Sequence, residues 1–248
     1  MRINYKEPYW LKFSWDLSTH HEHQFVTEFN KVDNNDIRDF FFLEDFMITV
    51  SFRIPKRGER DEISAIFGKS GKNLALSYNT TTETLGFEFW TKQKDGDKPN
   101  FVHFLGVSRS DVEKGVTLSI VREGNYIYLL EGFGSLSLLK RESFEGEMID
   151  DYRSSPLYFG VANPGTDLKH HRFFGELDLN YFLMVGDVSN QGILEEIHNT
   201  EVERLVTKPY YHKILCLHNF KKQNNLGFVY DESMYTNFLE IVPTEFIL

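Results

Sequence analysis

Short segments in which apolar and polar residues alternate recur along most of this chain, and they constrain its fold more than any other feature. The clearest is the segment 46–53, in which apolar residues share one side of an extended chain: Phe46, Ile48, Val50 and Phe52. Thr49 falls on the opposite side, where we expect a replacement to cost much less stability. Comparable segments follow at residues 63–69, 73–79, 84–91, 101–107, 116–123, 125–131 and 135–140. Gly, Asn, Asp or Lys clusters separate them, which is typical of an antiparallel β-sandwich or barrel.

A longer alternating strand is predicted from residue 177 to residue 185. Its apolar positions, which we expect to be buried, are Leu177, Leu179, Tyr181 and Leu183. After a Gly-Asp break, Ser189 is a suitable helix N-cap, and Ile193 and Ile197 lie one helical turn apart. The sequence therefore predicts one short helix near residues 190–199.

The order of these features resembles the end of laminin G-like domains in the concanavalin A-like lectin/glucanase superfamily. The matching residues are Gly175, Leu177-Asp178, the strand to Val185, Ser189 and Glu196-Ile197. The segment VTLSIVREGNYIYLL is similar to the paired strands of the same domains, with a tight turn at Glu123-Gly124-Asn125. The resemblance covers residues 44–199 and implies an all-β, concanavalin A-like jelly-roll sandwich of two antiparallel sheets.

The flanking segments, residues 1–43 and 200–248, also show aromatic-rich strand patterns, and no Pro/Gly-rich linker sets them apart. A segment of about 50 residues buries little core by itself. We therefore expect residues 1–248 to form a single domain, in which the tail adds edge strands beside the N-terminal segment.

The composition limits the classes of partner and location. A formal net charge of -10 argues against a phosphate-backbone partner, because nucleic-acid binding depends on Lys and Arg. The N-terminus lacks the continuous apolar run of a secretory signal, and no stretch approaches the length of a membrane span. The single cysteine, Cys216, excludes an internal disulfide and suits a reducing compartment. We expect a soluble, cytoplasmic protein with no nucleic-acid partner.

The segment Glu176-Leu177-Asp178-Leu179-Asn180 is similar to the Glu-x-Asp-x-Glu motif of laminarinase-type glycosidases in the same superfamily. The first two acids match, but Asn180 stands where that motif requires its second catalytic glutamate. A carboxamide can neither protonate a leaving group nor act as the nucleophile of a retaining mechanism. We therefore expect no enzymatic activity, with a diverged glycosidase as the less favoured alternative.

Two features offer groups suited to sugar binding. Trp90 lies on the strand side opposite Leu85, Phe87 and Phe89, so its indole is a candidate platform for a sugar ring. A loop near residues 162–172 concentrates the polar groups that sugar hydroxyls require: Asn163, Asp167, His170, His171 and Arg172. The alternatives are a Trp90 face covered by other strands and a loop that is an ordinary solvated turn.

Two groups of residues raise the question of a metal. His20, His21 and His23 lie close together, but the sequence nominates no further ligand, which favours a solvated loop. The acidic loop 95–97 and Asp167 offer oxygen ligands for calcium, the one cofactor that the resemblance suggests. We otherwise expect no cofactor and no metal site.

These features together predict a non-catalytic, lectin-like domain that binds an oligo- or polysaccharide, as a module beside a glycan-processing enzyme. The alternative from another class is a protein–protein interaction or assembly module, which binds a partner or a second copy through edge strands and has no sugar site. A natural chain that continues past Leu248 is compatible with both.

Overall fold

The computed structural model describes the following residues: 10–13, 23–27, 45–55, 63–69, 74–92, 101–132, 136–148, 157–159, 175–185, 196, 200, 202–219, 228–229, 233 and 239–243. The strands at 10–13, 23–27, 157–159, 175–185, 228–229 and 239–243 are described by their backbone. All strand pairs in this part of the chain are antiparallel.

One sheet contains seven strands in the order β1-β13-β3-β8-β9-β10, with β14 also paired to β13. Its strands are β1 (Trp10–Phe13), β3 (Phe46–Arg53), β8 (Val116–Glu123), β9 (Tyr126–Glu131), β10 (Ser137–Ser143), β13 (Gly175–Val185) and β14 (Ile214–Asn219). We call this sheet A.

The other sheet, sheet B, contains nine strands in the order β11-β6-β5-β4-β12-β2-β16-β15, with β7 also paired to β6. Its strands are β2 (His23–Thr27), β4 (Ile63–Lys69), β5 (Leu74–Asn79), β6 (Thr84–Lys92), β7 (Phe101–Ser108), β11 (Glu147–Met148), β12 (Leu157–Phe159), β15 (Phe228–Val229) and β16 (Leu239–Pro243). The helical elements whose two ends lie within the described residues are short: η3 (Val112–Lys114), α3 (Val202–Leu205) and η5 (Tyr211–Lys213).

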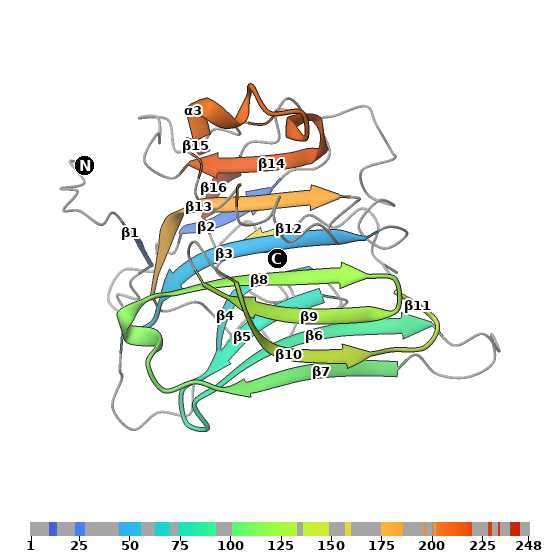
Figure 1. The fold of residues 1–248 in the computed structure, drawn as a ribbon. Coiled ribbons are helices and arrows are strands. Elements are labelled where there is room, and N and C mark those ends of the chain that lie inside the picture. The colour runs from blue at the N-terminus through green and yellow to red at the C-terminus, as the bar shows by residue number, and fades with distance from the viewer. Residues whose placement is uncertain are drawn as a thin grey trace.

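The two sheets stack as the layers of a sandwich, which confirms the predicted fold class (Figure 1). Side chains from both inner faces meet in the core. The Phe144 ring lies 5.3 Å from the Phe89 ring of sheet B, and the Arg122 guanidinium of sheet A lies 5.7 Å from the same Phe144 ring. At one margin, β10 lies beside β7, and Lys140 Nζ donates to the Gly106 carbonyl at 3.4 Å.

The alternation in β3 correctly identifies its inner residues, but its outer face is buried as well. The four predicted core residues are all at most 2% exposed: Phe46, Ile48, Val50 and Phe52. Thr49 is 0% exposed, so the opposite face is also buried, and the small cost expected for replacing Thr49 stays a prediction. Its Oγ1 lies 2.9 Å from Ser119 Oγ on β8, and Ser51 makes a similar hydroxyl contact with Thr117 at 2.7 Å. These cross-strand hydrogen bonds satisfy the polar groups on this face.

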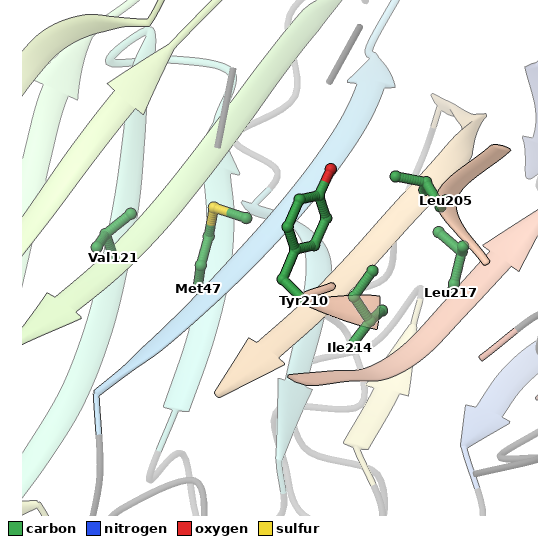
Figure 2. Packing of buried hydrophobic residues seen from close by; sticks show 6 residues of the cluster. All are labelled: Met47, Val121, Leu205, Tyr210, Ile214 and Leu217. Carbon is green, nitrogen blue, oxygen red and sulfur yellow. The ribbon is translucent and has the colours of Figure 1, made fainter. Parts of the chain in front are cut away.

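The C-terminal segment covers the outer face of β3 at Met47. Helix α3, the following turn and β14 place apolar side chains in one cluster with residues of β3 and β8 (Figure 2). Its buried members are Met47, Val121, Leu205, Tyr210, Ile214 and Leu217. Sheet A therefore has a second apolar layer on its outer side.

The tail differs in part from its prediction. Residues 202–205 and 211–213 are helical where a strand pattern was expected, and Tyr210 between them is buried in the outer cluster. Farther on, β16 pairs with β2, so the tail does lie beside an N-terminal strand. The assignment of residues 1–248 to one domain stays a prediction.

Two local predictions concern turns and helices. The paired strands β8 and β9 are joined at Gly124 and Asn125 as expected, and Gly124 has a φ of 55°, which glycine adopts without strain. Of the helix expected near 190–199, Glu196 is described, and it is helical. The side chains predicted to be buried on β13 lie outside the described residues.

Candidate functional site

Trp90 lies on the outer side of the sheet formed by β6 and β7. Of the predicted sugar-binding residues, it is the one whose side chain the structure describes. Leu85, Phe87 and Phe89 are buried in the core, so alternate residues of β6 face outward, as the alternation predicts. Three cross-strand pairs form this outer surface, which we call the β6–β7 face: Gly86–Gly106, Glu88–Phe104 and Trp90–Val102. Trp90 itself is half-buried.

The two glycines of the β6–β7 face make room for an aromatic ring. A Cβ atom added at Gly86 would overlap Cε2 and Cζ of Phe104, and one added at Gly106 would lie 2.7 Å from Cε1. The Phe104 ring therefore lies across the glycine pair, where any other residue would displace it. Phe104 is nevertheless 52% exposed, so the ring also presents apolar surface to solvent. Val102, at 54% exposed, extends this apolar surface.

A carboxylate lies beside the aromatic residues of this face. Trp90 Nε1–H donates a long hydrogen bond of 3.4 Å to Glu88 Oε1. The register places Glu88 directly opposite Phe104 of β7. Glu88 and Trp90 are two residues apart on β6, so they are neighbours on the same face of the strand. Glu88 thus presents a carboxylate acceptor between two aromatic side chains, and the indole contact restrains its orientation.

The opposite side of β7 anchors this surface to the core. The His103 ring stacks on Phe89 with centroids 4.7 Å apart, and His103 Nε2 lies 2.8 Å from Thr91 Oγ1. Burial lowers the pKa of His103, and Glu142 partly opposes that effect. The imidazole is therefore neutral at neutral pH, and it acts as a packing and hydrogen-bonding group beneath the β6–β7 face.

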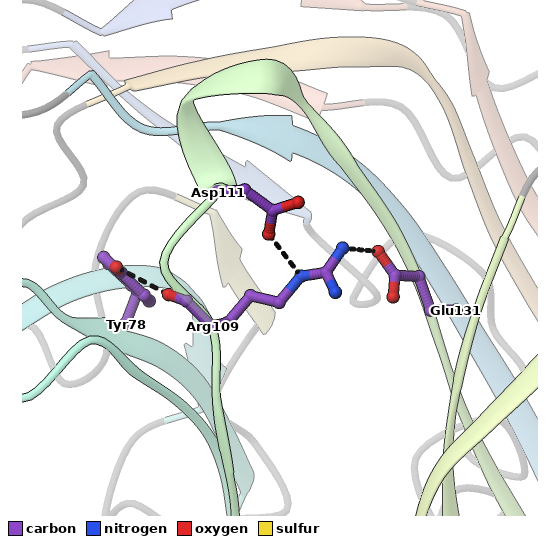
Figure 3. A network of polar contacts seen from close by, with 4 residues as sticks. All are labelled: Tyr78, Arg109, Asp111 and Glu131. Atoms are coloured by element: carbon purple, nitrogen blue, oxygen red, sulfur yellow. Dashed lines mark hydrogen bonds and ion pairs between the residues drawn. The ribbon is translucent and has the colours of Figure 1, made fainter.

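A polar network at the other end of β7 pairs its charged groups with one another (Figure 3). Arg109 forms ion pairs with Asp111, at 2.9 Å, and with Glu131, and its carbonyl accepts a hydrogen bond of 2.9 Å from the Tyr78 hydroxyl. Burial raises the pKa of Tyr78, and nearby acids reinforce the rise. Because two carboxylates share this guanidinium, we assign the network to linking β5, β7 and β9 rather than to ligand binding.

The remaining predicted site residues fall where the structure describes no side chains. The loop candidates Asn163, Asp167, His170, His171 and Arg172 lie outside the described residues, as do Asp95 and Asp97. His20 and His21 are also outside, and His23 is described by its backbone in β2. Within the described part of the chain, no group of three or more His, Cys, Asp or Glu residues is arranged to hold a metal ion. The calcium hypothesis therefore stays a prediction.

Sequence reasoning identified Trp90 but missed Phe104 and Val102. The segment FVHFLGV was predicted to be a strand, but its outward side was not compared with that of β6. The sequence feature that could have identified this face is the pair Gly86 and Gly106 on neighbouring strands, with Phe104 two residues from Gly106. Glycines within strands often mark a place where another group packs closely on the backbone. Pairing these glycines required the register between β6 and β7, which the structure supplies.

Comparisons with known proteins identify similar sandwiches. The binding domain of botulinum neurotoxin DC in complex with SialylT matches with a TM-score of 0.53 and 11% identity, over 80% of this chain and 44% of that chain. The CBM40 of the Ruminococcus gnavus IT-sialidase matches with a TM-score of 0.49 and 15% identity, over 76% of this chain and 96% of that chain. The same CBM40 bound to alpha2,6 sialyllactose matches at 0.44 and 14% identity, over 70% of this chain and 97% of that chain.

No family model and no curated protein sequence matches this chain. The structural likeness to the neurotoxin domain, at 11% identity, supports a common jelly-roll-like sandwich and no closer relation. The laminin G-like assignment stays a prediction. No helix within the described residues is long and apolar enough to cross a membrane.

Proposed function

We propose that this protein is a non-catalytic glycan-binding domain and that the β6–β7 face is its binding surface. The observation on which the proposal rests is the grouping of Trp90 and the exposed Phe104 ring around Glu88. Sugar sites combine a flat aromatic surface, which covers the apolar C–H side of a ring, with polar groups that pair its hydroxyls. The β6–β7 face contains both components.

The arrangement suits binding by a restrained surface. Phe104 is held by the glycine pair, and Trp90 is held by its contact with Glu88. A ligand would therefore find the aromatic groups already ordered, which lowers the entropic cost of binding. The sandwich shared with the neurotoxin domain, whose structure is in complex with SialylT, is compatible with this role. Because this chain covers 44% of that domain, the ligand of the neurotoxin does not identify the ligand here.

The cross-strand neighbours of Glu176 favour the non-catalytic interpretation. In the register of β13, Glu176 lies opposite Arg53 of β3 on one side and Lys12 of β1 on the other. Cross-strand positions of opposite charge stabilise a sheet, so the register is compatible with a structural role for Glu176. Asn180 at the third motif position also lacks the chemistry of the missing acid.

A glycan array probed with the purified protein tests this proposal. We expect binding to at least one class of oligosaccharide, and a Trp90→Ala variant should lose it. A matched control is Leu138→Ala, which removes an exposed apolar side chain from β10 of sheet A and should leave binding at the β6–β7 face unchanged. An array without hits, or binding that survives both Trp90→Ala and Phe104→Ala, would contradict the proposal.

A second candidate function is an assembly module, favoured by the exposed residues of β7. Among the described strands, β7 pairs with β6 alone, and Phe101 and Val102 are 53% and 54% exposed. An edge strand with exposed apolar side chains is suited to pairing with a second copy. Light scattering coupled to gel filtration distinguishes the glycan-binding function from assembly: a dimer that Val102→Lys converts to a monomer would favour assembly.

The cytoplasmic location also stays a prediction.

A further inference from the structure

A second cluster of aromatic and charged side chains lies on the outer face of sheet A. Tyr126 and Tyr128 alternate with the buried Ile127 and Leu129 on β9, so their side chains point away from the core. Arg141 of β10 is the cross-strand partner of Tyr128. Trp90 points outward from sheet B, so the two clusters occupy opposite sides of the sandwich.

The guanidinium of Arg141 is stacked on this aromatic pair. Its Cζ lies 3.9 Å from the centroid of the Tyr126 ring and 5.4 Å from that of Tyr128. The two rings lie 6.3 Å apart, and the Tyr128 hydroxyl donates a hydrogen bond of 3.1 Å to Glu123 Oε2. That contact fixes the Tyr128 ring, and the rings in turn restrain the guanidinium.

Arg141 differs from other arginines of the described chain in its charge partners. Arg109 is shared between Asp111 and Glu131, and Arg122 is buried in the core. Arg141 is exposed, and within the described residues no carboxylate lies within ion-pair distance of it. In a chain with a net charge of -10, an exposed cation that is left unpaired on an aromatic support suggests a ligand.

The chemistry of a stacked guanidinium defines that ligand. Stacking occupies the face of the planar group and leaves its edge of N–H donors available, and that edge matches the two oxygens of a carboxylate. Holding the group on Tyr126 also reduces the side-chain entropy that binding must overcome. We propose that Arg141, supported by Tyr126, binds the carboxylate of an acidic sugar at a site separate from the β6–β7 face. The choice of a sugar as the bearer of the carboxylate rests on the proposed glycan-binding function.

The test compares two ligands that differ in the carboxylate: glucuronate and glucose. Both are titrated at fixed ionic strength into protein labelled with ¹⁵N, while the Nε–H signal of Arg141 is followed by NMR. We expect a saturable shift with glucuronate and at least about tenfold weaker binding of glucose, the ratio expected when one charge-assisted bidentate contact is lost. An equal response to glucose or to sodium chloride would overturn the proposal.

Three variants separate specific binding from general attraction. Arg141→Lys keeps the charge but removes the planar fork, so glucuronate binding should weaken about tenfold. Tyr126→Phe should retain binding, whereas Tyr126→Ala should weaken it because the guanidinium loses its support. Unchanged affinity in Arg141→Lys or in Tyr126→Ala would overturn the proposed geometry.

The outcome is distinguishable from a failure of the proposed function. Trp90→Ala should leave glucuronate binding at Arg141 intact. If oligosaccharides bind at Trp90 while glucuronate produces no saturable shift at Arg141, this inference alone is wrong. If neither site responds to any saccharide, the glycan-binding function is wrong and the inference falls with it.

Discussion

The substitution Gly86→Ala tests the central geometric feature of the β6–β7 face, which is an aromatic ring held by a glycine pair. The added Cβ would overlap the ring of Phe104, so the ring must move toward solvent. The backbone of β6 need not move, because the obstructing atoms belong to a side chain that is 52% exposed. The perturbation should therefore alter the binding surface while the core stays folded.

The magnitude follows from the burial of the ring. A fully buried aromatic side chain removes roughly 150–250 Å² from water, so the covered half of Phe104 corresponds to about 100 Å² and at most about 2.5 kcal/mol. Part of this contact survives when the ring moves, and replacing glycine by alanine within a strand contributes about 0.5–1 kcal/mol of stability. We expect a net loss of about 0.5–1.5 kcal/mol in the free energy of unfolding.

A double-mutant cycle measured by urea denaturation gives the decisive comparison. In a Phe104→Ala background there is no ring to displace, so Gly86→Ala should be neutral or stabilise the protein by up to about 1 kcal/mol. The coupling energy between the two positions should therefore be about 1 kcal/mol or more. If Gly86→Ala destabilises the protein equally in both backgrounds, the ring does not occupy the space above the glycine and the reasoning is refuted.

Further predictions concern stability elsewhere in the sandwich. Met47→Ala should lower the free energy of unfolding by about 2–5 kcal/mol because Met47 is buried in the outer apolar cluster, and a loss below about 1 kcal/mol in urea denaturation would contradict that second layer. Gly146→Ala should cost about 1–3 kcal/mol more than Gly124→Ala, with urea denaturation as the measurement. Both glycines have positive φ, but a Cβ at Gly146 would also overlap the Lys92 carbonyl, whereas the space at Gly124 is open. The pKa of His103 is lower in the folded protein than its ordinary value of 6.5, so near and below pH 6.5 the unfolded chain binds more protons than the folded one. The free energy of unfolding should therefore fall as the pH drops through that region. His103→Gln should show a smaller decrease over the same range, and equal pH slopes for the two proteins would argue against a depressed pKa.

The alternation of side chains was sufficient to predict the sandwich because each strand encodes its inner face locally. The inner residues of β3 and β6 were identified correctly, and the outward direction of Trp90 followed from the same period. The buried outer face of β3 was not predictable in this way. Apolar residues between 202 and 217, which are distant in sequence, pack with Met47 on this face. The buried hydroxyls of Thr49 and Ser51 are paired with residues of β8, and that pairing depends on the register between the two strands.

The binding face was predictable only in part. Trp90 could be selected from one strand, but the surface also requires Phe104 and Val102 from β7, and their positions depend on register. Register depends on strand ends and on the pairing of Gly86 with Gly106, neither of which is fixed by alternation within a single segment. The polar loop at 162–172 remains a sequence-based candidate for additional contacts.

The most direct test of glycan binding at the β6–β7 face is the response of the Trp90 indole N–H signal during titration with an oligosaccharide selected by the array. Trp90 Nε1–H contacts Glu88, so a sugar placed on this face should change the environment of that proton. We predict a saturable shift of the Trp90 signal with the same dissociation constant as binding measured by calorimetry. Trp90→Phe assigns the signal, and Glu88→Gln should weaken binding, because the carboxylate is a stronger acceptor than a carboxamide. Calorimetric binding with no change at the Trp90 indole would place the glycan elsewhere and contradict the account.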